Sequence, residues 1–449
     1  MSSNATRTAR ATSAPMSEKR RLTFGWMSAI MLTLMMLINW GDKAIVGLAA
    51  GPLMEELNLS PSQLGGIGSI FFLVFCITPL FVGFIANRVS SRWLMAVLVL
   101  LWSVAQAPVL LAASYTTLLI SRIILGAAEG PTASLMHHHL HKWFKPAERA
   151  MPSSIGASGS SLGLAITAPI LTFIIAGFGW RAAFLFMAII GMIWVVVWLF
   201  IGHDGPLETY DSAEGAADQT KADEQYIPYP KILGTGTWIG GFLGSHFSYW
   251  ALALYTTWLP LYLQKALGMD LRDAGAIVAI PPLIGFGVFL LSGLIVDQAS
   301  RRGITMRWSV GMQIGLTSLL AGAALIAAAN VEDPAMKVVL LALAFGLPNS
   351  ALSLAFLSAT LITPVKQRGA VFAFTNVAFT SGGIIVPYLV GYLTERSSTE
   401  VGGYHQVFVL LGACLLIAGV ICALIINPER DARKLGLLAG PIKKEGVKL

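Results

Sequence analysis

Apolar residues recur along the chain in long runs that short polar stretches separate. A helix needs about 20 mainly apolar residues to cross the roughly 30 Å of hydrocarbon in a bilayer. Runs of this length lie at residues 25–49, 63–86, 93–112, 117–138, 150–175, 181–201, 237–263, 272–296, 308–329, 337–360, 370–393 and 405–426. The pattern predicts an all-α integral membrane protein with twelve transmembrane helices.

Only one of the polar breaks is long. Residues 202–236 are rich in Asp, Glu, Gly and Ser, a composition typical of a solvated linker. This break divides the spans into two sets of six. The predicted organisation is a cytoplasmic N-terminal tail at 1–24, six-helix bundles at 25–201 and 237–426, a cytoplasmic linker at 202–236, and a cytoplasmic C-terminal tail at 427–449.

Composition agrees with a membrane protein and indicates its orientation. Of the 449 residues, 55% are hydrophobic and 12% are charged, whereas soluble domains contain about 25% charged residues. The formal net charge is +7, and most Lys and Arg residues lie at the chain ends and in loops on one predicted side. The positive-inside rule therefore predicts a multi-pass protein of the cell membrane with both termini in the cytoplasm. This orientation signal accounts for the basic charge, and we expect no nucleic-acid partner.

The N-terminal tail and the cysteines indicate no further function. The first 21 residues are polar and basic and lack the apolar core of a signal peptide, so we expect the first span to be retained. Met16 is an alternative start that the sequence does not decide. Cys76, Cys414 and Cys422 lie in apolar runs, which favours small buried side chains over a disulfide framework or a metal site. We expect no metal and no cofactor.

Two short stretches place four ionisable groups inside otherwise apolar spans. They are Asp42 and Lys43 in the first span and Arg122 and Glu129 in the fourth. A charge near the middle of a bilayer costs about 2.5–3.5 kcal/mol on insertion scales, and such residues usually face a bundle interior or a water-filled pathway. The four charges therefore predict a transporter and locate its working centre.

The two halves of the chain resemble each other at matching positions. Similar loops follow the second and the eighth spans, and they contain Gly83, Asn87, Arg88 and Arg92 in the first half and Gly293, Asp297, Arg301 and Arg302 in the second. Weak repeats between spans of the same direction are typical of a parallel duplication. These loops and the six-plus-six layout resemble the major facilitator superfamily over nearly the whole chain.

A narrower resemblance rests on four motifs. They are Asp42-Lys43, the stretch from Arg122 to Gly130, the stretch from Trp143 to Arg149, and the stretch from Tyr255 to Tyr262. Together they resemble the anion:cation symporter family, which includes transporters of sugar acids, phthalate and related organic anions. The resemblance implies proton-coupled symport of a small organic carboxylate anion by a fold that is commonly monomeric, with proton-coupling acids at Asp42 and Glu129.

The charged residues suggest a division of roles. Arg122 and Glu129 share one helix face about 10 Å apart, so Glu129 is a candidate proton carrier and Arg122 a partner that controls its charge. The alternative is a static buried ion pair. Lys43 is expected to attract the anion and Asp42 to face the proton pathway, unless both lie at the outer rim. The family commonly has arginine at position 43, and lysine offers a point charge in place of a planar fork, which leaves the substrate open.

Neutral residues complete the predicted binding site. The candidate lining residues are Trp40, Phe75, Ser160, Tyr249, Tyr255, Ser353 and Asn376. Relatives that carry sugar acids tend to have more polar groups at the first two positions, so an aromatic or less hydroxylated acid is favoured. The alternative is that the aromatic residues only pack or sit at the membrane interface.

The repeated loops predict a gate. By resemblance, Asn87, Arg88, Arg92, Asp297 and Arg301 would hold one conformation closed. Asn87 stands where the superfamily usually has aspartate, which implies either a weakened inward gate or a neutral replacement.

Other signals are interpreted as structural. His137, His138, His139 and His141 have metal-like spacing but lie at the cytoplasmic end of the fourth span, which favours an interfacial cluster. Residues 159–163 fit a G-x-S-x-G pattern without the strand–turn–helix context of a hydrolase. His246 is interpreted as a packing histidine, with a cavity-facing role as the alternative. No nucleotide-binding loop is present, so we expect neither an enzyme nor an ATP-driven pump. An anion exchanger or exporter and a non-transporting receptor remain alternatives to symport.

Overall fold

The computed structural model describes residues 16–86, 88–145, 148–209, 226–364 and 367–438. Within these residues the regular secondary structure is helical. The helices of the first half are α1 (Glu18–Leu48), α2 (Ala50–Leu57), α3 (Pro61–Ala86), α4 (Ser91–Val104), α5 (Ala107–Leu111), α6 (Tyr115–Glu129), α7 (Thr132–His141), α8 (Ala150–Phe178) and α9 (Trp180–Ile201). A short 3₁₀ turn at Pro206–Thr209 follows.

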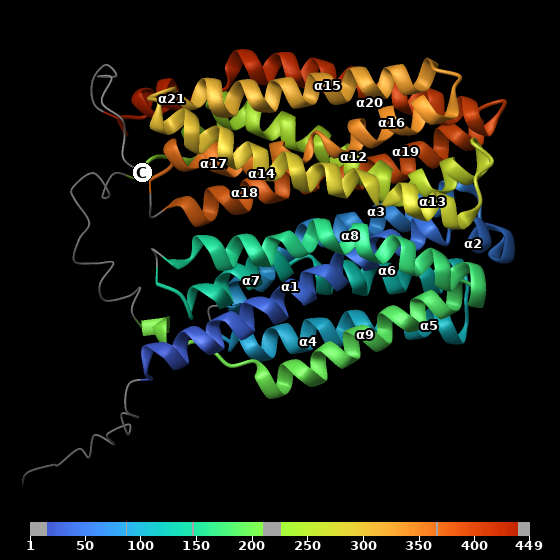
Figure 1. Ribbon diagram of the computed structural model, residues 1–449, viewed down its shortest axis with the longest axis horizontal. Helices are drawn as coiled ribbons and strands as arrows, with labels where there is room; N and C mark the ends of the chain where they lie inside the picture. Colours follow the sequence, from blue (N-terminus) through green and yellow to red (C-terminus); the bar gives the residue numbers. More distant parts are fainter. Residues whose placement is uncertain (1–15, 87, 146–147, 210–225, 365–366, 439–449) are drawn as a thin grey trace, which may run out of the picture.

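The second half repeats this arrangement. Its helices are α11 (Tyr229–Leu233), α12 (Gly236–Lys265), α13 (Leu271–Val278), α14 (Ile280–Arg301), α15 (Met312–Asn330), α16 (Pro334–Gly346), α17 (Asn349–Leu361), α18 (Arg368–Thr380), α19 (Gly382–Arg396), α20 (Glu400–Ile425) and α21 (Pro428–Lys434). A single π-helical turn at Arg307–Gly311 precedes α15. The two halves form two layers of roughly parallel helices, and α1 begins at the same end of the molecule at which α21 lies (Figure 1).

Ten helical segments among the described residues are long and apolar enough to cross a membrane. The α6–α7 pair and α12 lie alongside them (Figure 1) but are not among the ten. Their sequences explain this difference, because α6–α7 contains Arg122, Glu129 and four histidines, and α12 is rich in Gly, Ser, Thr and Tyr. These two predicted spans are less apolar than the other ten, and much of α12 is buried.

Polar segments next to the spans are more structured than a solvated linker would be. Ile227, in the predicted linker, is buried and exchanges two backbone hydrogen bonds with the side chain of Gln367, at 2.9 and 2.7 Å. In the predicted C-terminal tail, the carboxylate of Asp431 accepts hydrogen bonds from the backbone and the hydroxyl of Thr237, at 2.8 and 2.7 Å. These contacts fix the linker end and α21 to the second half.

The halves pack most tightly at the end of the molecule away from α21. The Cβ atom of an alanine at Gly65 of α3 would lie 2.2 Å from the carbonyl oxygen of Pro387 of α19. An alanine at Gly391 would approach the carbonyl oxygen of Pro61 equally closely, at 2.2 Å. Only glycine allows the two backbones to approach this closely. Contact at this end leaves the central cavity described below between the two halves.

Candidate transport site

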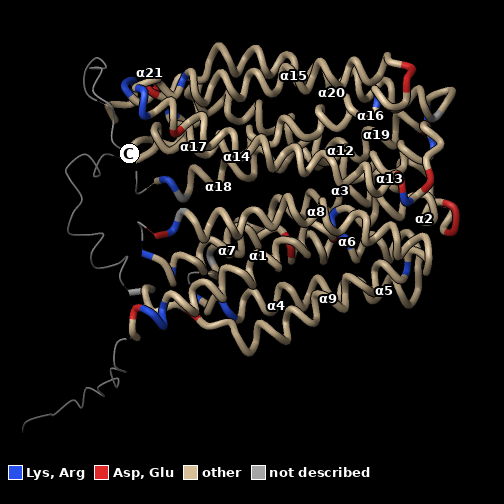
Figure 2. Tube along the Cα trace, viewed as in Figure 1, with Lys and Arg blue, Asp and Glu red and all other residues tan. Residues whose placement is uncertain are grey.

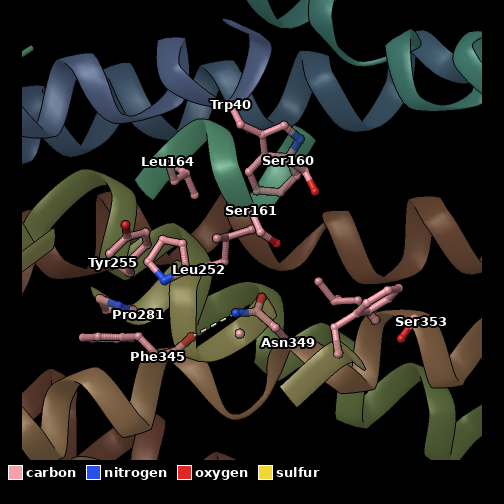
Figure 3. Close-up of a pocket in the computed structure, with 14 residues that line it drawn as sticks. Trp40, Ser160, Ser161, Leu164, Leu252, Tyr255, Pro281, Phe345, Asn349 and Ser353 are labelled. Atoms are coloured by element: carbon pink, nitrogen blue, oxygen red, sulfur yellow. Dashed lines mark hydrogen bonds between the residues drawn. The ribbon is translucent and has the colours of Figure 1, made fainter. Parts of the chain in front are cut away.

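A cavity of about 160 Å³ lies between the two halves. Its wall combines α1 and α8 of the first half with α12, α14, α16 and α17 of the second. Figure 3 shows side chains from both halves around this space. The lining residues are Trp40, Ser160, Ser161, Leu164, Leu252, Tyr255, Pro281, Pro282, Gly285, Phe289, Phe345, Asn349, Leu352 and Ser353. A site built by both halves changes shape when the halves move.

The sequence-based candidates divide into two groups. Trp40, Ser160, Tyr255 and Ser353 lie on the cavity wall, and their binding roles stay predictions. The other candidates, which lie outside this wall, are Lys43, Phe75, Tyr249 and Asn376. Sequence reasoning did not select Asn349, whose amide the structure places on the wall from the start of α17. Its position inside an apolar span was the signal that could have identified it.

Hydroxyl and amide groups on the wall already donate to nearby carbonyl groups. Ser160 Oγ donates to the Ala157 carbonyl at 2.6 Å, and Ser353 Oγ donates to the Ser350 carbonyl at 3.0 Å. Tyr255 donates its hydroxyl to the carbonyl of Val278 at 2.5 Å. The Asn349 amide donates to the carbonyl of Phe345 at 3.3 Å, as the dashed line in Figure 3 marks. Their oxygen atoms retain the capacity to accept hydrogen bonds from a ligand.

Lys43 and Glu129 form a buried ion pair just behind this wall. Lys43 Nζ lies 3.4 Å from Glu129 Oε2, and the two side chains are 1% and 0% exposed. Lys43 also donates to Asn39 Oδ1 at 2.5 Å. Its ammonium group lies 4.6 Å from the centre of the Trp40 ring and 4.8 Å from that of Phe75. The Trp40 ring that contacts the ammonium group also lines the cavity.

Asp42 has different partners from its neighbour Lys43. Its Oδ1 accepts a hydrogen bond from Gln106 Nε2 at 3.0 Å. Arg122 Nη1 donates to the backbone carbonyl of Asp42 at 3.4 Å, and its guanidinium lies 5.4 Å from the centre of the Phe184 ring. Successive residues of a helix point about 100° apart, so the two charges of α1 contact different neighbouring helices.

The direct partner of Glu129 is Lys43, whereas the sequence suggested Arg122. Seven residues separate Arg122 from Glu129 along the helix, which is about 10 Å and too far for direct contact. The first span supplies a closer cation. Sequence reasoning assigned no role to Asn39 and did not consider Gln106. Asn39 lies one helical turn before Lys43, and Gln106 is an isolated amide in an apolar run. Both residues could therefore have been identified from the sequence.

The four charges are balanced but not fully hydrogen-bonded. Two are basic and two acidic, and each residue is at most 7% exposed. Within the described part of the chain, no hydrogen-bond partner contacts Asp42 Oδ2, Glu129 Oε1, or the Nε and Nη2 atoms of Arg122. Buried polar atoms without partners are uncommon in folded proteins and mark sites where groups exchange partners.

The predicted gate residues make contacts within their own halves. Arg88 is exposed, and Arg92 donates to the carbonyl of Leu199 in α9 at 2.5 Å. Asp297 and Arg301 form an exposed ion pair of 3.0 Å one turn apart on α14. Asn87 lies outside the described residues. The gating role of these residues stays a prediction.

Asp204 connects several segments of the first half, at the end of the molecule where α1 begins. Its carboxylate accepts a hydrogen bond from Ser91 Oγ at 2.6 Å and another from Ser90, and it lies 3.8 Å from Lys142 Nζ. Burial opposes the ionisation of Asp204, but these hydroxyls and Lys142 outweigh it and hold its pKa below the usual range. This anchor fixes the start of the linker to the first half.

The histidines have structural partners. His139 shares a hydrogen bond of 2.8 Å with Ser91 and accepts one from Trp143 at 3.3 Å. His246 contacts the carbonyl of Ala378 at 3.1 Å and accepts from Trp250 at 3.0 Å. Across the described ranges, no group of three or more His, Cys, Asp or Glu side chains is arranged to hold a metal ion.

Comparison with known proteins identifies the family. Residues 32–361 match the Major Facilitator Superfamily. The chain belongs to the major facilitator superfamily. It is 30% identical to the hexuronate transporter of Bacillus subtilis over 412 residues, which cover 89% of this chain and 94% of that protein. It is also 30% identical to a probable sulfoacetate transporter of Cupriavidus necator over 426 residues, which cover 91% of this chain and 95% of that protein.

Solved structures confirm the predicted fold. A bacterial homologue of the human lysosomal transporter Spinster, in an inward-facing and occupied conformation, superposes with a TM-score of 0.76, at 17% identity and with 94% and 99% of the two chains covered. A D-xylose–proton symporter gives a TM-score of 0.73 at 17% identity, with 90% and 99% covered. The twelve-helix major facilitator fold is therefore confirmed. Relatives place the chain in the anion:cation symporter type of this superfamily. The protein is a membrane transporter and not an enzyme.

Proposed function

We propose that the protein is a secondary active transporter that moves a small organic carboxylate anion together with protons by alternating access. The observation that carries this proposal is the buried Lys43–Glu129 pair, whose ammonium group contacts the Trp40 ring that lines the central cavity. A membrane protein has little reason to bury such a pair for stability alone, because desolvation offsets most of its attraction.

The pair suggests how proton and anion binding are linked. While Glu129 is ionised, it neutralises Lys43 at 3.4 Å. When Glu129 takes up a proton, Lys43 loses that counter-charge and can pair with a substrate carboxylate that enters past Trp40. In both states the buried ammonium group has one anionic partner, so neither state buries an uncompensated charge. Proton and anion then occupy the site together, which is symport.

The substrate class follows from the cation and the cavity wall. A lysine next to a cavity lined by acceptor oxygens suits an anion whose other groups donate hydrogen bonds. Hexuronate and galactonate, which the names of two relatives give as substrates, are hydroxylated carboxylates. The sulfoacetate relative is equally similar to this chain, so a hydroxyl-free acid stays a second candidate. The aromatic side of the wall, at Trp40 and Phe345, also keeps the aromatic acids that the sequence favoured as candidates.

Orientation and conformation complete the proposal. Blue segments in Figure 2 gather at the end that carries the start of α1 and α21, and we assign this end to the cytoplasm of a cell-membrane protein. The tight packing at Gly65 and Gly391 then closes the outer side. We therefore assign the structure to an inward-directed state and propose that the protein works as a monomer, in which rocking of the halves about the cavity gives access to the other side.

Uptake by purified protein in liposomes tests this function. The panel contains a hexuronate, galactonate, glucarate, sulfoacetate and an aromatic acid, each with and without an inside-alkaline pH gradient. We expect the gradient to drive accumulation of at least one acid. Asp42→Asn and Glu129→Gln should abolish that accumulation, and exchange of substrate should persist in at least one of them. If both variants still concentrate substrate, the assignment of the proton carriers is wrong.

The same liposomes separate the alternatives. A receptor would bind substrate without flux, and an exchanger would move substrate only against another anion. For a singly charged anion, two protons per cycle carry one net charge, and a membrane potential would then contribute about 2.3 kcal/mol per 100 mV. Uptake that does not respond to potential would exclude this stoichiometry for such an anion.

A further inference from the structure

Asp42 lies on the opposite side of α1 from the substrate cavity. The residue is fully buried and is not part of the cavity wall. Its carboxylate contacts Gln106, which lies between α4 and α5. Helices α4, α5 and α9 form the side of the first half that is remote from the second half (Figure 1). A proton on Asp42 is therefore held inside the first half, whereas the Lys43–Glu129 pair lies next to the interface between the halves.

The charged groups around Asp42 come from two helices. Arg122 and Glu129 of α6 and Lys43 of α1 act on its carboxylate electrostatically. Arg122 hydrogen-bonds only the backbone of Asp42, at 3.4 Å, and its ring contact is with Phe184 of α9. In the described part of the chain, Gln106 is thus the side chain that hydrogen-bonds the carboxylate itself, at 3.0 Å.

A glutamine amide can bind both protonation states of a carboxyl group. Its nitrogen donates to the ionised carboxylate, as Gln106 Nε2 does here, and its oxygen can accept from the protonated form after the amide rotates. Gln106 Oε1 and Asp42 Oδ2 are both buried and have no hydrogen-bond partner among the described residues. Both atoms are hydrogen-bond acceptors, so a proton taken up by the Asp42 carboxylate can be donated to the Gln106 amide oxygen.

We infer that Gln106 is the positioning residue of a proton-binding site at Asp42 that is separate from the substrate cavity. The inference rests on the proposed function, because it takes Asp42 as a coupling group. The inference gives the protein two proton-binding sites, and a proton has a different effect at each. The proton on Glu129 is linked to substrate through Lys43, whereas the proton on Asp42 is linked to the contact of α1 with Gln106 at the α4–α5 junction.

The experiment compares Gln106→Leu with Gln313→Leu in liposomes. Gln313 is a half-buried glutamine of α15 in the second half, and its amide donates to Ser292 of α14. Its replacement therefore controls for the loss of a side-chain amide inside a span. Initial proton-driven uptake is measured against external pH at a fixed internal pH. Gln106→Leu removes the hydrogen bond to the ionised carboxylate and the bond to the protonated carboxyl. The bond to the charged form is roughly twice as strong, so the loss favours the protonated form and the midpoint should move up by about one pH unit. Gln313→Leu should leave the midpoint in place.

Further variants separate failure of this inference from failure of the proposed function. When Asp42→Asn is already present, adding Gln106→Leu should not change the pH dependence of substrate exchange, measured across the same pH range. If Asp42→Asn abolishes accumulation but Gln106→Leu keeps the wild-type midpoint, Gln106 has no positioning role and the proposed function stands. If Asp42→Asn still accumulates substrate, Asp42 is not a coupling group, and the part of the proposed function on which the inference rests fails first. Where Gln106→Leu does not fold, Gln106→Glu replaces it, and sharing of a proton between two carboxyls should raise the midpoint by at least one unit. An unchanged midpoint in that variant overturns the inference.

Discussion

The two halves bury polar groups in different ways. In the first half, α1 and α6 carry four charged side chains deep within the spans, each at most 7% exposed, in addition to Arg21 near the start of α1. In the described spans of the second half, the buried polar side chains are neutral. Many are hydroxyls that donate to their own helix, such as Ser245 to the carbonyl of Gly241 at 2.5 Å and Ser248 to that of Gly244 at 2.7 Å. A hydroxyl satisfied within its helix does not depend on its neighbours.

A buried charge does depend on neighbouring helices. Lys43 of α1 needs Glu129 of α6, and Asp42 of α1 needs Gln106 from the α4–α5 junction. Adding or removing a proton therefore changes contacts between helices of the first half, whereas the second half offers a neutral surface that such a change leaves intact. The comparison shows that the two halves can share one arrangement of helices while the buried charges of the described spans lie in the first half.

Removing Lys43, the buried cation next to the cavity, should have the largest effect on substrate binding. Lys43→Ala deletes the positive charge next to the cavity, and a charge-assisted contact contributes about 1.5–3 kcal/mol. We expect substrate affinity to fall by about 10–100-fold, measured by calorimetry in detergent. Unchanged affinity would place anion recognition in the second half. Lys43→Arg is the matched control, because it keeps the charge and should retain most of the binding.

These expectations show which parts of the site could be predicted from the sequence. The spans, the two halves and the four intramembrane charges follow from composition and spacing, because a bilayer penalises polar groups strongly. The pairing of Glu129 with Lys43 does not follow, since it depends on how α1 packs against α6. Likewise, Asp204 and Ile227 looked like linker residues, and only the folded chain brings them to Ser91 and Gln367.

A second prediction tests whether the halves move as separate bodies. Gly65→Ala places a methyl group 2.2 Å from the carbonyl oxygen of Pro387, whereas the same change at Gly83 meets nothing within 4 Å. Overpacking costs about 1–3 kcal/mol, so Gly65→Ala should disfavour this state by about tenfold or more. Distance measurements between spin labels on the outer ends of α3 and α19 should show the ends separated.

The control variant sharpens that result. Gly83→Ala should leave the label distances and the uptake rate as in the wild type. If both variants behave alike, the close contact between α3 and α19 does not limit the conformational change, and the two halves cannot be treated as bodies that separate there.

The neutral half should respond more weakly than the charged half. Tyr249 of α12 is 2% exposed, packs against Phe72 and Phe379, and has a hydroxyl without a hydrogen-bond partner among the described residues. If this hydroxyl binds substrate, as the sequence suggested, Tyr249→Phe removes one neutral hydrogen bond. We expect affinity to fall by about 2–10-fold, less than for Lys43→Ala. A loss of affinity as large as that of Lys43→Ala would show that the second half contributes to substrate binding as strongly as the first.

The smallest effects should come from the two carboxylates that anchor the chain outside the spans. Asp204 fixes the start of the linker to the first half, and Asp431 fixes α21 to the second. Burial opposes ionisation of Asp431, but Arg430 and Thr237 outweigh it and lower its pKa, as Ser90, Ser91 and Lys142 do for Asp204. A lowered pKa in the folded state stabilises the fold above about pH 4, the usual value for aspartate, and that contribution is lost as the pH falls through the folded-state pKa.

Thermal unfolding in detergent at pH 7 and at pH 3.5 tests these anchors. Asp431 is 2% exposed and Asp204 25% exposed, so Asp431→Asn should lower stability at pH 7 by about 1–2 kcal/mol and Asp204→Asn by about 1 kcal/mol or less. Both differences should shrink at pH 3.5, because the same carboxylates in the unfolded chain, whose pKa is about 4, take up protons there before the folded ones do. Asp297→Asn, which breaks an exposed pair on α14, is the matched control and should have no measurable effect at either pH. A larger loss for Asp204→Asn than for Asp431→Asn would mean that the first half depends on its linker anchor more than the second half depends on α21.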